Sequence, residues 1–233
     1  FGGPANCCGV IQFRAGDAKA AGQIGGNTVA GFAATGAASV LTWCPTCNIQ
    51  LSEIVMPGSA AGFALEHVVP YIAARLELLR SHFVRPVNKR VALHEHPGVA
   101  GVTEGVVKIL TAIPGIELVD LEQPRVGYMC NSLAPVPEYK RELHARELAA
   151  AEAAGVDCLV GIYHACHREL CAHETEICPE LGLDHVIIVF TDGEQYFAYI
   201  VAIDKQFQRA NDYCPLADLG KCFLDRPAEP GAG

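Results

Sequence analysis

The sequence predicts an α/β protein with mostly parallel sheets, made of two similar halves. Helical patterns alternate with short apolar runs of strand length along the chain, which is typical of this class. One strand-and-turn block occurs twice at a constant spacing, which indicates an internal duplication. The 233 residues are 51% hydrophobic, enough to bury a substantial core in one large domain or two smaller ones.

The predicted elements follow one another in regular alternation. A helical pattern of small residues over 16–37 leads into the apolar run 38–43, which is expected to be a buried strand. The later strands are expected at 90–95, 116–121, 156–163 and 185–190, and the later helices at 65–83, 101–113, 137–155 and about 193–209. The helix at 137–155 has the strongest pattern, because Pro137 suits its first turn and Gly155 its end.

The charge of the chain argues against several kinds of partner. The net charge is −9 and no cluster of Lys and Arg is present, so a nucleic-acid-binding surface is not expected. The most apolar stretches are rich in glycine and shorter than the roughly 18 residues that a membrane span needs. No signal peptide is recognisable at the start, so we expect a cytoplasmic protein without a membrane span.

Eleven cysteines are many for a cytoplasmic chain, and the number is odd. In a reducing compartment, cysteines at motif spacing are more often metal ligands or redox groups than disulfides. Cys158 is an exception, because it lies inside the apolar run 158–163 and is expected to be a small buried hydrophobic residue.

Two cysteine pairs are predicted to meet at one edge of a sheet. Cys7 and Cys8 are followed by Gly9, which permits a tight turn, and Cys44 and Cys47 begin 36 residues after Cys8, at the end of a predicted strand. Parallel strands bind ligands at their carboxyl ends, and the intervening helix can return the chain to that edge. Four thiolates are therefore expected to converge.

Several chemistries use such a cysteine set. Structural zinc and iron–sulfur clusters both prefer soft sulfur ligands and would use all four residues. A thioredoxin-like dithiol would need only Cys44 and Cys47, and would leave Cys7 and Cys8 without a role. Four buried, unligated cysteines are the remaining alternative, but two pairs at this spacing rarely coincide by chance.

The duplicated strand-and-turn block has a constant offset of 119 residues. It matches Gly36 with Gly155, Cys47 with Cys166 and Leu51 with Leu170. The second copy keeps Cys130 and Cys166, but it has Met129 for Cys7, Asn131 for Gly9 and Tyr163 for Cys44. The second half is therefore interpreted as a degenerate copy of the first.

A dense group of ligand-type side chains nevertheless lies in the second half. The group comprises Cys130, His164, Cys166, His167 and Cys171. His167 and Cys171 are four residues apart and could share a helix face. These residues could bind an ordinary cluster, a metal ion or a substrate thiol, or they could line a polar rim that binds no metal.

The motifs "CCG" and "CPTC" resemble those of the CCG-domain, or cysteine-rich-domain, proteins typified by the CCG-containing subunit of heterodisulfide reductase. Relatives of that family act in glycolate and lactate oxidation and in thiol-dependent fumarate reduction. The resemblance implies two Rossmann-like CCG repeats, at 1–86 (the first half) and 87–210 (the second half). Cys214 and Cys222 match nothing in these repeats, so residues 211–233 are expected to form a C-terminal arm that packs on a partner or on the second repeat.

The resemblance also implies a ligand set. In the family, five thiolates hold a noncubane [4Fe–4S] cluster, and Cys7, Cys8, Cys44 and Cys47 match the last four of them. The fifth is expected upstream of Phe1, so the chain is expected to lack its own beginning. In the second half, residues 91–99 resemble the family's H-D-P-C-H stretch with Pro97 in place of the cysteine. One noncubane cluster is therefore expected in the first half, and a second cluster, zinc or no metal in the second.

The family resemblance implies disulfide or thiol redox chemistry in sulfur metabolism. We expect a heterodisulfide-reductase-like subunit, of the kind found in bacterial sulfur-oxidation complexes. Its expected partners are a ferredoxin-like iron–sulfur subunit, a flavoprotein subunit and a thiol, disulfide or sulfur-carrier substrate. The alternatives are a non-catalytic subunit braced by zinc or a cluster, and the iron–sulfur electron-transfer subunit of a hydroxy-acid oxidase.

Overall fold

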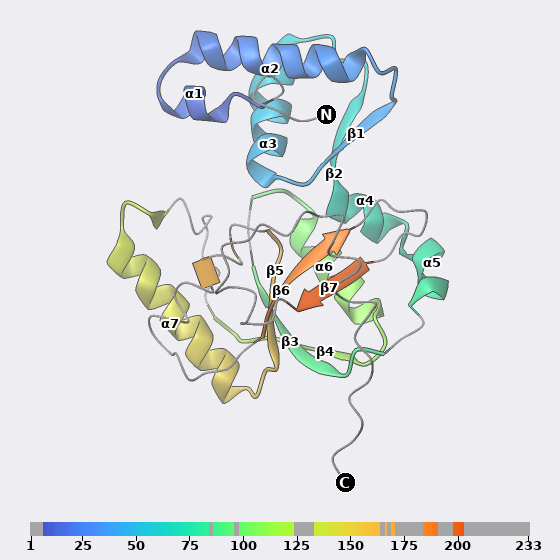
Figure 1. Ribbon diagram of the computed structural model, residues 1–233, viewed down its shortest axis with the longest axis vertical. Coiled ribbons are helices and arrows are strands. Elements are labelled where there is room, and N and C mark those ends of the chain that lie inside the picture. The colour runs from blue at the N-terminus through green and yellow to red at the C-terminus, as the bar shows by residue number, and fades with distance from the viewer. Residues whose placement is uncertain are drawn as a thin grey trace. The chain divides into compact units, whose positions relative to one another are not determined.

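The computed structural model describes residues 7–83, 86–95, 98–123, 133–163, 166 and 169–170, and the backbone of 184–190 and 198–202. It is an α/β structure with two sheets, and the strands of both are mostly parallel (Figure 1). The predicted α/β class with mostly parallel sheets is thereby confirmed.

The first half contains a small parallel sheet and the helices around it. Its elements are α1 (Val10–Arg14), α2 (Ala18–Ala33), β1 (Ser39–Thr42), α3 (Pro45–Ile49), the π-helical segment η1 (Gln50–Val55), the 3-10 turn η2 (Met56–Gly58) and β2 (Ala64–His67). Strands β1 and β2 pair in parallel, with Thr42 opposite His67. The carboxyl ends of both strands therefore lie side by side.

A larger sheet follows. Its surrounding helices and its strands are α4 (Val68–Ala74), α5 (Leu76–Leu79), η3 (Arg80–His82), β3 (Lys89–His94), α6 (Val102–Ala112), β4 (Ile116–Val119), α7 (Pro137–Ala153), β5 (Cys158–Gly161), β6 (Asp184–Phe190) and β7 (Ala198–Ala202). The strand order is β4-β3-β5-β6-β7, and only the β6–β7 pair among these is antiparallel.

Alternate residues of β3 face two different helices, because successive side chains of a strand point to opposite faces. Val91 packs in the core cluster that contains Val106 of α6, whereas Ala92 packs in the cluster that contains Leu148 of α7. The two helices therefore cover opposite faces of the sheet, as right-handed crossovers on either side of β3 require.

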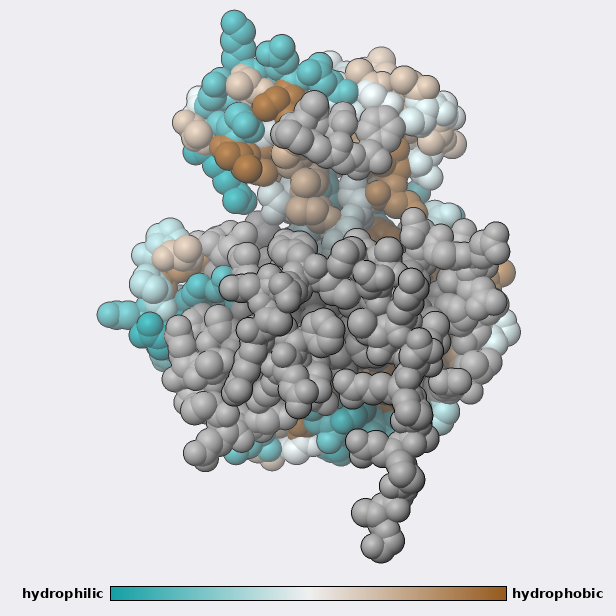
Figure 2. Space-filling view, in the orientation of Figure 1, coloured by the Kyte–Doolittle hydropathy of each residue, from teal (hydrophilic) through white to brown (hydrophobic). Residues whose placement is uncertain are grey.

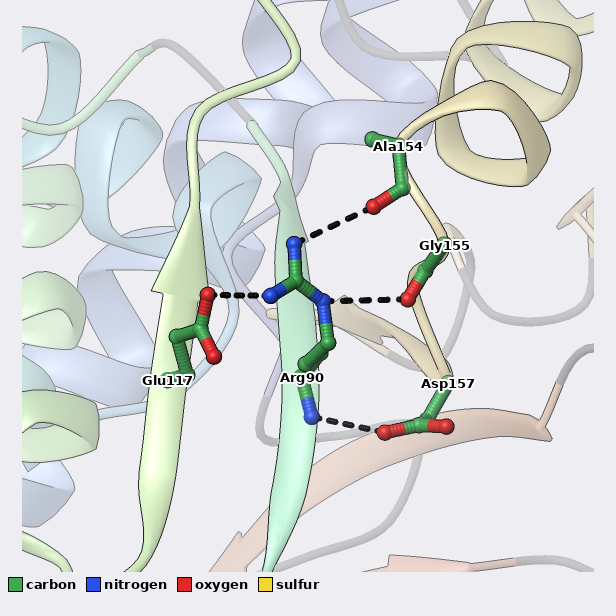
Figure 3. Close-up of polar contacts among 5 residues, drawn as sticks. All are labelled: Arg90, Glu117, Ala154, Gly155 and Asp157. Carbon is green, nitrogen blue, oxygen red and sulfur yellow. Dashed lines mark hydrogen bonds and ion pairs between the residues drawn. The ribbon is translucent and has the colours of Figure 1, made fainter.

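At the amino end of this sheet, one arginine ties three segments together (Figure 3). The Arg90 guanidinium donates to the carbonyl oxygens of Ala154 (3.2 Å) and Gly155 (3.1 Å) and pairs with Glu117 of β4 (2.5 Å). The backbone N–H of Arg90 also donates to the carboxylate of Asp157 (2.8 Å). The turn that follows α7 is thus attached to the start of β3, which sets where β5 begins.

The predictions for 38–43 and 65–83 need correction. Strand β1 is only half-buried, and Leu41 is 42% exposed, because a sheet of two short strands has few neighbours to cover it. The predicted helix at 65–83 starts as strand β2 and is interrupted at Arg75, where α4 ends. Pairing with β1 determines the conformation of this stretch, which its own sequence pattern does not reveal.

The final helix predicted at about 193–209 is also wrong. Residues Ala198–Ala202 form strand β7, which pairs antiparallel with β6. Its sequence "AYIVA" contains aromatic and β-branched residues, which favour a strand over a helix.

The two halves differ in the size of their sheets, with two strands in the first and five in the second among the described residues. The duplication and the boundaries at 1–86, 87–210 and 211–233 therefore stay predictions.

The described helices include none that is long and apolar enough to cross a membrane. Cys214 and Cys222 lie outside the described residues.

Candidate metal centre

All four cysteines of the first half lie at turns that lead into helices. Cys7 and Cys8 precede α1, Cys44 is the residue before α3, and Cys47 lies within α3. The four are free thiols: Cys8 is buried, Cys7 and Cys47 are half-buried, and Cys44 is exposed. Cys8 and Cys47 belong to a small apolar cluster that also contains Leu51.

Helix α2 holds the Cys7–Cys8 turn in place. Gly9 has a φ of +79°, and a Cβ there would lie 2.4 Å from the carbonyl oxygen of Ala21 in α2. The hydroxyl of Thr28, also in α2, donates to the carbonyl oxygen of Cys7 (2.8 Å). Glycine is therefore required here both for the backbone conformation and for the close approach of the helix.

The second cysteine pair is held by the start of α3. Pro45 occupies the first position of the helix, where a missing N–H costs nothing. The carbonyl oxygen of Cys44 accepts the N–H of Asn48 (2.9 Å), and the Asn48 side chain donates to the hydroxyl of Thr42 at the end of β1 (2.8 Å). The strand and the helix are thereby linked across the C-x-x-C turn.

The thiols of Cys8, Cys44 and Cys47 shift one another's pKa values. Cys47 acts on both Cys8 and Cys44, and Cys7 has a smaller effect on Cys8. The hydrogen bond from Cys47 is the main reason why the pKa of Cys8 and that of Cys44 are each lowered from 9.0 to about 6. The same hydrogen bonds raise the pKa of Cys47, which therefore keeps its proton.

This arrangement concentrates negative charge in a partly buried place. Of the thiols whose pKa shifts, those of Cys8 and Cys44 lose their protons most readily, and burial opposes their charge. No group of three or more Cys, His, Asp or Glu side chains in the described part of the chain is arranged to hold a metal ion as it stands. The donor chemistry, four cysteine sulfurs of which Cys7, Cys8 and Cys47 pack in one cluster, nevertheless fits a thiolate-bound iron–sulfur cluster, which is larger than a single ion.

A histidine and two aromatic residues form the neighbouring wall. The imidazole of His67, at the end of β2, lies 2.9 Å from the carbonyl oxygen of Trp43 and 3.1 Å from the hydroxyl of Tyr163, both measured from Nε2. The three rings are in contact with one another. Tyr163 comes two residues after β5, so the second half contributes directly to this wall.

The hydrogen bonds of His67 define its protonation state. Its Nδ1 accepts the N–H of Val69 (3.2 Å), so the ring proton is on Nε2 and donates to Trp43. Burial lowers the pKa of His67, which keeps the ring neutral. Burial also raises the pKa of Tyr163, and the charge of Cys44 adds to this effect. This wall is therefore uncharged beside the thiolates.

All four cysteines lie in a segment that matches a known protein family. Residues 3–52 match the CCG cysteine-rich domain. The CCG domain is typical of iron–sulfur subunits of heterodisulfide-reductase-like proteins, and it occurs in oxidoreductase subunits. The chain matches no characterised protein and no solved structure.

The CCG match does not extend to the second half, and the structure describes little of the ligand group predicted there. Cys166 is buried in the main apolar core beside Tyr163. Cys158 is likewise buried, which confirms the prediction for that residue. The other predicted ligands and the positions compared with them lie outside the described residues: Pro97, Met129, Cys130, Asn131, His164, His167 and Cys171.

The second half also contains a cavity of about 520 Å³, a size that suits a small ligand. It lies where β3 and β4 end, and Asp120, Lys108 and Arg146 are among its lining residues. In its wall, the imidazole of His94 pairs with the carboxylate of Glu147 (2.7 Å), and both side chains are largely buried. This pair supplies a polar, hydrogen-bonded surface at the carboxyl edge of the sheet.

The sequence patterns did not reveal His67, Trp43 or the His94–Glu147 pair as site residues. His67 lies in a stretch whose pattern is helical, and its contact with Tyr163 joins residues 96 positions apart. The positions of His67 and His94 at strand ends, where parallel sheets bind ligands, are the signal that could have identified them.

Proposed function

We propose that this chain is a heterodisulfide-reductase-like iron–sulfur subunit that carries out disulfide and thiol redox chemistry in a multi-subunit electron-transfer complex. Cys7, Cys8, Cys44 and Cys47 would hold a noncubane [4Fe–4S] cluster. When bound, such a cluster would supply iron that can bind a sulfur atom and exchange electrons with it.

One observation carries the proposal: Cys7, Cys8 and Cys47 of the matched CCG domain pack in one cluster, and Cys8 and Cys44 each have a pKa of about 6. Metal-binding cysteines must be deprotonated, so the low pKa values prepare them for binding. A cationic iron group would also neutralise thiolates whose charge is opposed by burial.

The protein residues have separable roles in this proposal. Cys44 is exposed, so the centre is open to solvent and to a substrate sulfur on that side. The neutral wall of His67, Trp43 and Tyr163 offers an apolar and hydrogen-bonding surface for the organic part of a substrate. Reduction of a disulfide consumes two electrons and two protons and yields two thiols, and the electrons would come from a partner iron–sulfur or flavin subunit.

Exposed apolar side chains support a subunit contact near the centre. Helix α1, directly after Cys7 and Cys8, exposes Ile11 (70%) and Phe13 (44%). Figure 2 shows several brown, apolar areas on the visible face of the first half, among teal polar ones. Apolar side chains that stay exposed beside a redox centre are typical of an interaction surface.

A second function is favoured by the asymmetry within the C-x-x-C. Cys44 is exposed and has a lowered pKa, whereas Cys47 is half-buried and has a raised pKa. A metal-free dithiol that exchanges with disulfides has this arrangement of an attacking and a resolving cysteine. Such chemistry would not need Cys7 or Cys8.

Replacing Cys8 distinguishes the two functions. The full-length protein is purified without oxygen, and its iron, acid-labile sulfide and zinc contents and its visible absorption are measured. We expect iron and sulfide in similar amounts in the wild type, and loss of most of both in Cys8→Ser. Cys158→Ala, which changes a buried cysteine outside the centre, is the matched control and should keep the metal.

Two results would contradict the proposal. Stoichiometric zinc without sulfide would indicate a bracing site rather than a redox cluster. An unchanged iron content in Cys8→Ser would show that the cluster lies elsewhere, and metal-free disulfide exchange retained in that variant would favour the dithiol function.

A further inference from the structure

A buried amide follows the C-x-x-C motif, and its nitrogen has no hydrogen-bond partner among the described residues. Gln50 comes three residues after Cys47, is 4% exposed, and its Nε2 has no hydrogen-bond partner among the described residues. It also begins the π-helical segment η1, a rare conformation that is often found at functional sites. Burial without a partner is costly for an amide, because the group loses its hydration and gains nothing in exchange.

The same helix shows how a buried amide is ordinarily accommodated. Asn48, two residues earlier, is also buried, and its Nδ2 donates to the hydroxyl of Thr42 (2.8 Å). One of the two buried amides therefore has a bonded nitrogen and the other does not. The difference indicates that Gln50 is placed for something other than local stability.

Gln50 follows Cys47 by about one helical turn. Residues three apart lie on the same side of a helix, and helical side chains lean back toward the amino end. Gln50 is thus the next residue in the series Cys44, Cys47, Gln50, in which the first two are hydrogen-bonded thiols. Cys47 is the thiol that acts on both Cys8 and Cys44.

We propose that Gln50 donates its side-chain N–H to an anionic sulfur atom held at Cys47, either a cysteine thiolate or a sulfide of the bound cluster. This inference rests on the proposed function. Gln50 is then a positioning residue that becomes hydrogen-bonded only when the centre is assembled. Hydrogen bonds to cluster sulfurs are one of the factors that set the reduction potential, because they stabilise the more negative, reduced form.

The test compares Gln50→Leu with Asn48→Leu in the full-length protein. In the metal-free form, Gln50→Leu should unfold at the same urea concentration as the wild type or a higher one, because it removes an unpaired donor. Asn48→Leu should unfold at a lower concentration, because it breaks the bond to Thr42.

The loaded form gives the second readout. With the iron and sulfide contents equal to those of the wild type, Gln50→Leu should have a more negative reduction potential, so that the ratio of reduced to oxidised cluster at a fixed potential falls by about tenfold. An unchanged potential at full iron content would overturn the role of Gln50 while leaving the proposed function intact. Lower stability of metal-free Gln50→Leu would also overturn it, and a wild-type protein without iron or sulfide would overturn both proposals.

Discussion

Gly9 and Ala21 are so close that a Cβ on Gly9 would lie 2.4 Å from the carbonyl oxygen of Ala21. This contact brings α2 against the turn that carries Cys7 and Cys8. The Thr28 hydroxyl, further along α2, holds the carbonyl oxygen of Cys7. The position of two of the four thiols therefore depends on a helix whose own sequence contains no metal ligand.

Replacing Gly9 with alanine is expected to destabilise the protein by about 2–4 kcal/mol, because the new Cβ adds a steric clash to an unfavourable positive φ. Urea denaturation of the metal-free protein measures the effect. Gly16→Ala is the control: Gly16 has a φ of +84°, but no described atom lies within 4 Å of the place that an alanine Cβ would take. That control should cost only about 1–2 kcal/mol. Equal losses in both variants would show that the contact with Ala21 is unimportant.

The reactivity of Cys44 should level off at an unusually low pH. Its pKa is lowered from 9.0 to about 6, mainly by the hydrogen bond from Cys47, and the thiolate is the reactive form. In the metal-free protein, the alkylation rate of Cys44 should rise with pH up to about 6 and change little above pH 7. Mass spectrometry of the modified peptide separates Cys44 from the other cysteines.

Cys47→Ala, which removes the hydrogen-bond donor, serves as the comparison for this measurement. Without the thiol of Cys47, the pKa of Cys44 should move back toward its ordinary value, and the rate should continue to rise beyond pH 7. A wild-type rate that still increases tenfold per pH unit between pH 7 and 8 would contradict the hydrogen-bonded arrangement.

Arg90 is expected to matter through its bonds to carbonyl oxygens rather than through its ion pair. Glu117 and Arg90 are both well exposed, so Glu117→Gln should cost less than about 0.5 kcal/mol. Arg90→Lys should cost about 1–2 kcal/mol, because an ammonium group cannot reach Ala154, Gly155 and Glu117 together. Urea denaturation measures the unfolding free energy of both variants. A larger loss of stability in Glu117→Gln than in Arg90→Lys would refute this explanation.

Much of the second half was predictable because its elements carry strong periodic patterns. Helix α7 begins at Pro137 and ends just before Gly155, as its end signals indicate, and β3, α6 and β5 lie within or close to their expected ranges. Strand β2 was not predictable, because "ALEH" has no strand-forming residue and becomes a strand by pairing with β1.

The candidate site also has a part that local sequence patterns predict and a part that they do not. The spacing of Cys7, Cys8, Cys44 and Cys47 predicts that they converge, because a turn motif and a strand end are local features, and their role as ligands stays a prediction. The contact between His67 and Tyr163 joins two separate sheets, and no local pattern records it. Gln50 was missed because the cost of an unpaired amide is visible only once the packing around it is known.

The last prediction concerns the number of irons. Tyr163 occupies the position that the duplication matches with Cys44. Its hydroxyl is hydrogen-bonded to His67 and its ring packs against Trp43, so it does not replace the cysteine as a ligand. Cys166 is buried in the apolar core. Cys130 and Cys166 together would supply only two thiolates, whereas a four-iron cluster uses about four. We therefore expect one cluster per chain, bound in the first half.

Iron analysis of the oxygen-free, full-length protein checks this expectation. A single cluster gives about four irons and four sulfides per chain. A variant with Cys130→Ser and Cys166→Ala should keep all of them, because neither residue contributes to the first centre. About eight irons in the wild type, with half lost in that double variant, would mean that the second half had recruited other ligands. Tyr163→Phe would then help to locate these ligands. The Tyr163 hydroxyl is bonded to His67, so its removal should leave the iron content unchanged whether the chain binds one cluster or two. A loss of iron would place Tyr163 itself at a second centre.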